Sequence, residues 1–426
     1  MSNAPYKRYP AYKDSGVEWL GEIPAGWEVK KLAWLTVCLD GRRVPLNSID
    51  RSTMRGEHPY WGANSIVDHV DRWLFDEELV LLGEDGAPFF DRTKPVAFHV
   101  NGRIWANNHV HVLRTTPAVG PAFLAYALNS VDYTNFIAGA TRDKLTQGDM
   151  NAIPIELPSL REQSAIVAFL DCETARIDGL IAKKERLIEL LQEQRDSLIT
   201  RAVASGLDSK VRLQETGSLI FPQVPAHWEL RKLRRVLKRV RRPVPVDAEE
   251  EYREIGIRSW GKGLFHKDAI KGALLEEKSV FSIEPGDFVL NIVFAWEGAV
   301  GVATEAERGM VASHRFPTYR VAADVDLDYV LMVLQTDQGR ALMDVNSPGA
   351  AGRNRTIRLD QFLNEEVPIA PLEEQRAIVQ TYRAEEARAA GLVAKVREAI
   401  QHLTELRTAL ISAAVTGKID VRSEVA

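Results

Sequence analysis

Cysteine is scarce in this 426-residue chain, which contains only Cys38 and Cys172. Two isolated cysteines exclude a disulfide framework and a cysteine-type zinc site, and they are typical of a reducing compartment. Long apolar runs are also missing: the longest, at residues 288–303, is interrupted by Asn291 and Glu297 and is too short to span a bilayer. The start, MSNAPYKRYP, has no apolar core, so no signal peptide is expected. We therefore expect a cytoplasmic protein with no membrane association.

Catalytic signatures are absent as well. The chain has no G-x-x-x-x-G-K-[ST] loop, no glycine-rich dinucleotide motif and no H-E-x-x-H. His109 and His111 alternate on an expected strand with no carboxylate close in sequence, a pattern more typical of packing or surface residues than of metal ligands. The turn GEDG (83–86) is more typical of a solvated turn than of a metal site. A chain of this length without such motifs is expected to be a binding protein with no catalytic residue, metal or cofactor.

The net charge of −5 counts mildly against a nucleic-acid binder, which is often basic. Positive charge is nevertheless concentrated locally, because RKLRRVLKRVRR (231–242) contains eight lysines and arginines. An acidic segment, DAEEEYRE (247–254), follows it. Net charge hides local patches of this kind, and the basic run by itself fits the solvated face of an exposed helix as well as it fits a DNA contact.

One ten-residue phrase occurs twice, as IPAGWEVKKL (23–32) and VPAHWELRKL (224–233). A second pair of segments, IPIELPSLREQSAIV (153–167) and VPIAPLEEQRAIV (367–379), repeats with an offset larger by eleven residues. A period near 200 residues is far too long for a solenoid repeat and indicates a duplicated domain. Each copy consists of the phrase, a variable region and a helical tail, and the second variable region carries the net insertion.

The two tails have apolar residues at helical spacing and contain no internal proline. Gly206 and Gly417 follow them, as C-terminal caps often do. A helix of roughly 40 residues is about 60 Å long and cannot bury its apolar stripe alone. We expect the two helices to pair as an antiparallel coiled coil, although each could instead pack on its own domain. The expected coiled-coil or partner-binding residues are Leu170, Ile177, Leu180, Leu191, Leu198, Leu392, Val396, Leu403, Leu406 and Leu410.

The variable regions are predicted to be rich in strands, each followed by a helix (121–133 and 327–343) and then by a polar, basic loop (138–150 and 346–362). The predicted fold class is therefore α+β, with two α/β domains separated by two long antiparallel coiled-coil helices in a pseudo-twofold duplication. The expected boundaries are a first domain at 1–155, a first helix at 156–206, a second domain at 207–368, a second helix at 369–417 and a tail at 418–426.

At this point the repeated motifs resemble a known family. GWEVKKL with HWELRKL, LPSLREQSAIVAFLD with APLEEQRAIV, and the heptad tails look like the specificity subunit of type I restriction-modification systems, which serve in host defence. YKDSGVEWLGEIPAGW is also typical of the start of that family, and the resemblance covers nearly the whole chain.

The resemblance implies a DNA-binding protein without catalytic activity of its own. Two target recognition domains would each bind one half of a bipartite double-stranded DNA sequence, and the paired helices would set the gap between the halves. Two DNA methyltransferase (modification) subunits would bind along the helices, and restriction/translocase subunits would join the complex. The strongly basic run departs from the family pattern, and we interpret it as a phosphate clamp formed by Arg231 and Arg235, with an exposed helix as the alternative.

Loop residues of types that bind bases or phosphates are the candidate DNA contacts, because arginine and asparagine form bidentate contacts with guanine and adenine. In the first domain they are Tyr60, Asn64, Arg92, Lys94, Asn108, His109, Arg142 and Lys144. In the second they are Arg258, Trp260, Asn291, Trp296, His314, Arg315, Arg353, Asn354 and Arg355. Two rival hypotheses remain: a stand-alone metal-dependent nuclease using Glu84, Asp85 or Asp91 near Lys94, and a coiled-coil scaffold that does not bind DNA.

Overall fold

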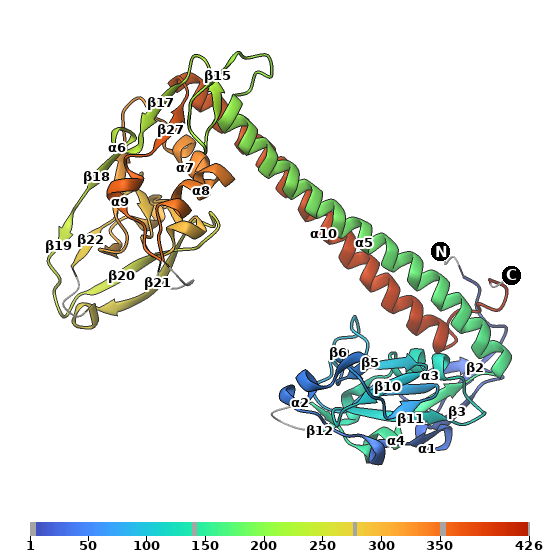
Figure 1. Ribbon diagram of the computed structural model, residues 1–426. Helices are drawn as coiled ribbons and strands as arrows, with labels where there is room; N and C mark the ends of the chain where they lie inside the picture. The colour runs from blue at the N-terminus through green and yellow to red at the C-terminus, as the bar shows by residue number, and fades with distance from the viewer. Residues whose placement is uncertain (1–5, 139–142, 276–278, 350–354, 425–426) are drawn as a thin grey trace. The chain divides into compact units, whose positions relative to one another are not determined.

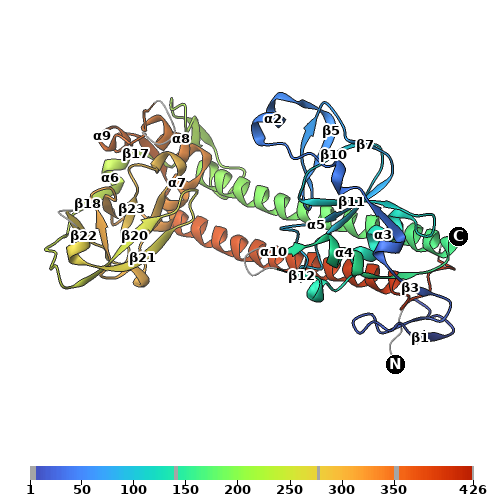
Figure 2. The same ribbon diagram turned by 90° about the horizontal axis from the view of Figure 1, so that it is seen from below.

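The computed structural model describes residues 6–138, 143–275, 279–349 and 355–424. The chain divides into two compact units, residues 1–185 with 396–426 and residues 186–395. The two longest helices, α5 (Leu160–Ser205) and α10 (Leu372–Val415), each contribute one half to either unit. Both views show these helices running side by side (Figures 1 and 2). Each unit is therefore built from a strand-rich domain and one half of a helix pair.

The first unit contains two four-stranded sheets, with the strand orders β4-β11-β8-β9 and β6-β5-β10-β7. The first sheet is antiparallel, whereas β5 and β10 of the second are parallel. Helix α3 packs on β8 and β9. The strands are β1 (Tyr12–Asp14), β2 (Glu22–Pro24), β3 (Glu28–Lys31), β4 (Thr36–Cys38), β5 (Arg55–Trp61), β6 (Ile66–Val70), β7 (Phe75–Asp76), β8 (Leu79–Gly83), β9 (Ala97–Val100), β10 (Arg103–Ala106), β11 (Val110–Thr115), β12 (Ile137–Ala138), β13 (Lys144–Leu145) and β14 (Pro154–Leu157). The short helices are α1 (Leu32–Leu35), η1 (Asp40–Arg42), α2 (Ser48–Thr53), α3 (Pro121–Leu128), η2 (Tyr133–Asn135) and α4 (Gln147–Ala152).

The second unit repeats this topology. Its sheets have the orders β18-β26-β23-β24 and β19-β22-β25-β20-β21, and β20 and β25 are again a parallel pair. The extra edge strand β19 and the longer hairpin β20–β21 distinguish it from the first unit. The strands are β15 (Leu213–Glu215), β16 (Gln223–Pro225), β17 (Glu229–Lys232), β18 (Leu237–Val240), β19 (Pro243–Val244), β20 (Glu251–Ile257), β21 (Leu264–Lys271), β22 (Val280–Ser282), β23 (Phe288–Leu290), β24 (Val300–Val302), β25 (Val311–Ser313), β26 (Thr318–Val321) and β27 (Glu366–Ile369). The helices are α6 (Leu233–Val236), η3 (Gly272–Leu275), η4 (Ala295–Glu297), η5 (Glu305–Glu307), α7 (Leu327–Gln335), α8 (Asp337–Val345) and α9 (Leu359–Phe362).

The expected single helix at 327–343 is instead two helices, α7 and α8. Thr336 lies between them in an extended conformation, and its hydroxyl accepts a hydrogen bond from Gly339 N at 3.1 Å. A threonine whose hydroxyl satisfies a free N–H favours the start of a new helix over continuation of the old one.

The repeated segments hold each long helix to its domain. The side chain of Gln163 accepts a hydrogen bond from Gly120 N and donates to the carbonyls of Ala118 and Pro158. Gln375 makes the same three contacts with Asp326 N, Asp324 O and Ala370 O. Both glutamines are buried, so the motif is repeated because it satisfies the same backbone groups twice.

The repeated segment at the start of each copy, at 23–32 and 224–233, packs against the end of a long helix. Gly417, beyond the end of α10, lies against Pro24 and Trp27 in the first unit, and Gly206, beyond the end of α5, lies against Pro225 and Trp228 in the second. Both glycines have the positive φ of a helix C-cap, +70° for Gly417 and +73° for Gly206. The predicted C-caps are therefore confirmed.

The helix pair is antiparallel in both units, as predicted. In the first unit Leu170 and Ile177 of α5 share a core with Leu410 of α10, and Arg407 forms an ion pair with Asp178 at 2.9 Å. In the second unit Ile199 of α5 shares a core with Ile378 of α10.

Three of the leucines predicted as coiled-coil or partner-binding residues are exposed. Leu180, Leu392 and Leu406 are 38%, 42% and 51% exposed. Ile181, the neighbour of Leu180, packs on the first core, and so does Leu403, which was predicted. A straight helix of 3.6 residues per turn drifts away from a strict heptad pattern, so a seam extrapolated by sevens leaves the contact.

The two ends of the chain meet in the first unit. Asp420 N donates a hydrogen bond to Lys7 O at 2.8 Å, and the Tyr12 hydroxyl donates to Gly417 O at 3.0 Å. None of the helices within the described ranges combines the length and apolarity of a bilayer-spanning segment.

Candidate nucleic-acid interface

Four loops of the first unit meet at one end of the sheets. Backbone hydrogen bonds join Asn107 N to Trp61 O, Glu84 N to His109 O, and Leu145 N to Glu84 O. We call the loops at 62–65, 83–87, 106–109 and 143–146 the first loop cluster. Loops held together in this way form a preorganised surface.

Three predicted residues are exposed in the first loop cluster: Asn64, Asn108 and Lys144. His109 lies beside them, with its Nδ1 2.5 Å from Asp85 Oδ1. The structure thus brings together residues separated by up to 80 positions in the sequence. Arg142, which we also predicted there, lies outside the described residues.

Three other candidates have different surroundings. Tyr60 is 2% exposed, and its hydroxyl accepts a hydrogen bond from Leu46 N, so it cannot present itself to DNA. Arg92 and Lys94 line a cavity of about 360 Å³ against α10, where Thr408 Oγ1 donates to Arg92 O. Their cations form ion pairs with Asp132 and Asp91.

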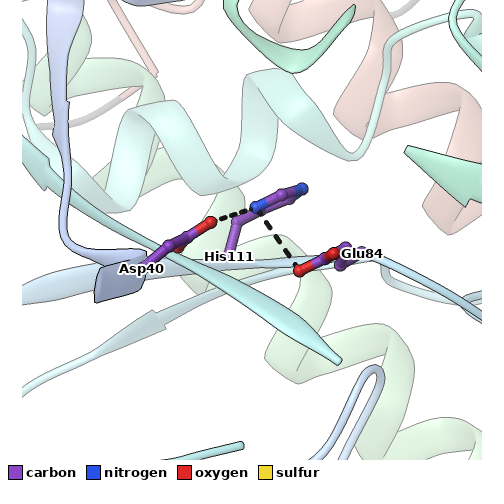
Figure 3. A group of neighbouring side chains, drawn as sticks. All are labelled: Asp40, Glu84 and His111. Carbon is purple, nitrogen blue, oxygen red and sulfur yellow. Dashed lines mark hydrogen bonds and ion pairs between the residues drawn. The ribbon is translucent and has the colours of Figure 1, made fainter. Parts of the chain in front are cut away.

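An ionic network lies beneath the first loop cluster (Figure 3). His111 is 1% exposed; its Nδ1 lies 2.6 Å from Asp40 Oδ2 and its Nε2 lies 3.0 Å from Leu145 O. Both ring nitrogens of His111 thus lie against hydrogen-bond acceptors, one a side-chain carboxylate and the other a backbone carbonyl. The expectation that the histidines have no carboxylate partner is therefore wrong for both His109 and His111.

Arg43 completes this network. Its guanidinium lies 2.6 Å from Glu84 Oε2 and 3.3 Å from Asp40 Oδ2, and Lys144 approaches Glu84 Oε1 at 3.3 Å. Burial raises the pKa of Asp40, but the hydrogen bonds from His111 and Val112 N–H outweigh it and the net pKa is lowered. Two carboxylates thus lie against Arg43, Lys144 and His111 in a partly buried site.

Sequence inspection did not find Asp40 or Arg43. Asp40 is 71 residues from His111, and Arg43 is 41 residues from Glu84. A local motif cannot show such a pair, because only the antiparallel pairing of β4 with β11 brings Asp40 to His111.

The donor atoms of Asp40, Glu84 and His111 lie within 4.8 Å of one another, a spacing that a metal ion would accept. The donors do not fit that role as they stand, because protons and guanidinium groups engage them. A metal ligand must offer a free lone pair, whereas Arg43 lies against both carboxylates and both nitrogens of His111 already have partners. The lysine expected to assist a nuclease site, Lys94, is paired with Asp91 at 2.9 Å.

A corresponding second loop cluster occurs in the second unit, at 258–263, 291–298, 313–316 and 355–358. Backbone hydrogen bonds join Trp260 N to Glu297 O, Ile292 N to Arg315 O, and Ile357 N to Ile292 O. Arg258, Trp260, His314 and Arg315 are exposed on it, as predicted for DNA contacts.

Trp260 has an unusual backbone. Its φ is 63°, which is the one positive value among the non-glycine residues that the structure describes, and its side chain is 62% exposed. A bulky residue in this conformation carries strain, and strained exposed residues cluster at functional sites. Sequence inspection selected Trp260 for its side chain and gave no sign of the strain.

The remaining candidates of the second unit support the loops from within. Asn291 is buried, and its Oδ1 accepts a hydrogen bond from Val293 N at 3.0 Å, so it shapes a turn and is not available to DNA. Trp296 is half-buried and lies under the guanidinium of Arg355, which also binds Asp344 and Ser347 O. Arg353 and Asn354 lie outside the described residues.

The basic run at 231–242 is not a helix. It forms the end of β17, the single turn α6, and β18. Arg231 of the predicted clamp is engaged by Asp324 at 2.7 Å and Glu229 at 3.0 Å, whereas Arg235 is exposed. The interpretation of this run as an exposed helix is therefore wrong.

Comparison with known proteins gives a consistent result. A family model described as the type I restriction modification DNA specificity domain matches residues 24–190. The chain is 36% identical over 148 residues, 35% of its length, to a putative type I restriction enzyme specificity subunit of Haemophilus influenzae, and that match spans 37% of the relative. It is 22% identical over 422 residues to the EcoDI specificity subunit of Escherichia coli, covering 94% of this chain and 90% of the relative.

Solved structures show the same fold. The HsdS subunit from Thermoanaerobacter tengcongensis superimposes with a TM-score of 0.52 at 17% identity, covering 93% of this chain and 98% of that chain. A chain from a study of complex assembly and conformational transition in the type I R-M system gives a TM-score of 0.64 at 16% identity, covering 92% and 98%.

Proposed function

We propose that this chain is a member of the family of type I restriction-modification specificity subunits and that it selects the DNA sequence on which such a complex acts. Each unit would bind one half of a bipartite double-stranded target. The observation that carries the proposal is the duplicated fold, in which each copy presents a cluster of polar loops at the same end of the same sheets.

The exposed residues of the two clusters are the proposed base and phosphate contacts. Asn64 and Asn108 have the amide groups that form paired hydrogen bonds with adenine, and Arg258 and Arg315 have the fork that fits guanine. Lys144 and His314, which are exposed beside them, are the proposed contacts to phosphates or bases. The two sets differ in residue type, so we propose that the two half-sites differ in sequence.

The chain is proposed to direct chemistry that other subunits perform. Two DNA methyltransferase subunits would bind along α5 and α10, and restriction/translocase subunits would join them in the cytoplasm. The ionic network supports a non-catalytic role, because protons and arginine engage its acid and base groups. Target recognition domains at 1–155 and 207–368 and conserved helices at 156–206 and 369–417 are the proposed divisions.

Methylome sequencing is the direct test. Cells that express this chain with the methyltransferase subunit of its own system would be compared with cells that lack this chain alone. We expect one bipartite motif with a fixed gap to be methylated in the first cells and unmodified in the second. Unchanged methylation would refute the proposal and favour a scaffold that does not bind DNA.

The helix pair is proposed to set the gap. Four residues inserted after Glu185 of α5, matched by four after Lys395 of α10, add about 6 Å of helix at about 1.5 Å per residue. Because base pairs are spaced by about 3.4 Å, we expect the gap to grow by about two base pairs. Both half-sites should stay the same, and altered half-sites would contradict the gap-setting role.

A further inference from the structure

A pocket of about 250 Å³ opens in the second unit where the chain passes from β18 to β19. It lies between the two sheets, because β18 pairs with β26 whereas β19 pairs with β22. Two arginines and a histidine supply its polar side, and Phe281 and Phe316 supply part of its apolar wall. The charged or titratable lining residues are Arg239, Arg241 and His314.

The positive charge of this pocket is uncompensated. No carboxylate among the residues that the structure describes forms an ion pair with Arg239 or Arg241. Nearby arginines are paired: Arg242 binds Asp287 at 2.7 Å and Arg320 binds the same carboxylate at 2.6 Å. Two neighbouring cations without counterions repel each other and raise the local potential, which favours an anionic ligand.

At the equivalent positions of the first unit, the two arginines of this pocket are replaced by a cysteine and an aspartate. Thr36 begins β4 after α1 as Leu237 begins β18 after α6, so Cys38 and Asp40 are the equivalents of Arg239 and Arg241. The register agrees, because Cys38 pairs with Leu113 of β11 and Arg239 with Tyr319 of β26. An acid bonded to His111 and Arg43 in one copy is thus replaced by a free cation in the other.

The pocket is continuous with the second loop cluster. His314 lines it, and the next residue, Arg315, is one of the exposed residues proposed to contact bases. A duplex held on that cluster would bring its backbone past the pocket mouth. The aromatic wall lowers the exposure of the bound group to water and so strengthens a charge-assisted hydrogen bond.

We propose that this pocket binds a backbone phosphate of the DNA beside the second half-site, with Arg239 and Arg241 as the donors. This inference rests on the proposed function. It assigns to the second unit a sequence-independent contact at the position where the first unit has Asp40, and it places the clamp predicted at Arg231 and Arg235 at Arg239 and Arg241 of the same run. The shared chemistry is a phosphate group, which DNA or inorganic phosphate could supply.

The test measures binding of the full chain, in complex with its methyltransferase subunit, to a duplex that carries the methylated motif. The double variant Arg239→Ala/Arg241→Ala is compared with Arg234→Ala/Lys238→Ala, which removes the same charge from exposed positions of the same run that do not line the pocket. Affinity is measured across a range of KCl concentrations, on duplexes with each base of the second half-site varied.

We expect the pocket variant to bind every duplex more weakly by the same factor. We also expect the slope of log K against log salt to be smaller by about 1, the value for one lost phosphate contact. The control variant should keep the wild-type slope to within half of that change. Equal changes in both variants, or a change that depends on the base, would overturn the proposal.

Two further results distinguish DNA from inorganic phosphate as the ligand, and failure of the pocket proposal from failure of the proposed function. If inorganic phosphate, titrated at constant ionic strength, binds the wild-type complex but the DNA salt slope is the same in the pocket variant, the pocket is an anion site that DNA does not use, and the proposal is wrong. If the wild-type complex itself binds no duplex in a sequence-dependent way, the proposed function fails first.

Discussion

The two units share a frame but differ in the chemistry between their sheets. Gln163 and Gln375 make the same three hydrogen bonds, and the strand orders correspond except for the extra edge strand β19 of the second unit. At one equivalent position, however, the first unit has Asp40 in an ionic network and the second has Arg241 in an open pocket. Duplication has kept the glutamines that satisfy the buried backbone and has changed the charge of the side chain at this position.

The largest effect is expected from breaking the ionic network. Asp40→Ala would leave His111 and the Arg43 guanidinium without the Asp40 carboxylate that they share, in a site where His111 is 1% exposed. Removing one partner of a buried network costs about 3–5 kcal/mol of unfolding free energy. Hydrogen exchange in the strands of the first unit, followed with increasing urea, would measure this loss.

The matched control is Arg241→Ala at the equivalent position of the second unit, which should change stability by no more than about 0.5 kcal/mol. The pH dependence has a definite sign. Because the pKa of Asp40 is lowered in the fold, its contribution is present above the unfolded value of about 3.9 and is lost as pH falls through the lower folded value. Similar losses in both variants would contradict the contrast between the two sites.

The duplicated architecture and the paired long helices could be predicted from the sequence, because their motifs are repeated and their apolar residues are periodic. The two L-x-E-Q motifs marked the helix starts, and spacing by sevens located Ile177 and Leu410 of the seam. It could not predict the Asp40–His111 pair, because strand pairing joins residues 71 positions apart. Burial of Tyr60 and Asn291 was equally invisible, since aromatic and amide side chains occur in both cores and binding loops.

Removing either of the two buried glutamines should lower the unfolding free energy by less than Asp40→Ala does, and by a similar amount in both units. Gln163→Ala leaves Gly120 N without its acceptor, and Gln375→Ala does the same to Asp326 N. Each unsatisfied buried group costs about 1–3 kcal/mol, so we expect losses of this size in both units. Ser164→Ala, which removes only an exposed hydroxyl contact with Leu160 O, serves as the control. A large loss of unfolding free energy in one unit alone would show that the two glutamines do not hold the long helices to their domains equally.

Glu156 is a further difference between the units, because Pro368 stands at its place in the second. Both carboxylate oxygens are buried without a hydrogen-bond partner, and burial raises the pKa of Glu156 to about 8. The unfolded chain loses this proton near pH 4.3, so the folded state binds more protons between about pH 4 and pH 8. Stability therefore falls as pH rises through this window, by at most about 1.4 kcal/mol per pH unit.

Glu156→Met removes this titration. We expect the melting temperature of the variant, relative to the wild type, to increase from pH 5 to pH 8 and to stay constant above pH 8. Thermal unfolding at half-unit pH steps would measure it, with Glu57→Met at an exposed site as control. A constant difference across the whole range would show that Glu156 does not titrate with folding.

The smallest effect on stability is expected at the exposed leucines of the helix pair. Leu180→Ser and Leu406→Ser each remove a side chain that is 38% or 51% exposed, so the unfolding free energy should change by less than about 0.5 kcal/mol. Ile177→Ser, on the same helix as Leu180 but 1% exposed, should lower the unfolding free energy several times more, because it opens a cavity in the first core.

If the leucines instead bind the methyltransferase subunit, the double variant Leu180→Ser/Leu406→Ser should weaken co-purification with that subunit while its melting temperature stays at the wild-type value. If the double variant changes neither stability nor subunit binding, the methyltransferase subunit does not bind at these leucines. The remaining faces of α5 and α10 would then be the candidates for its binding surface.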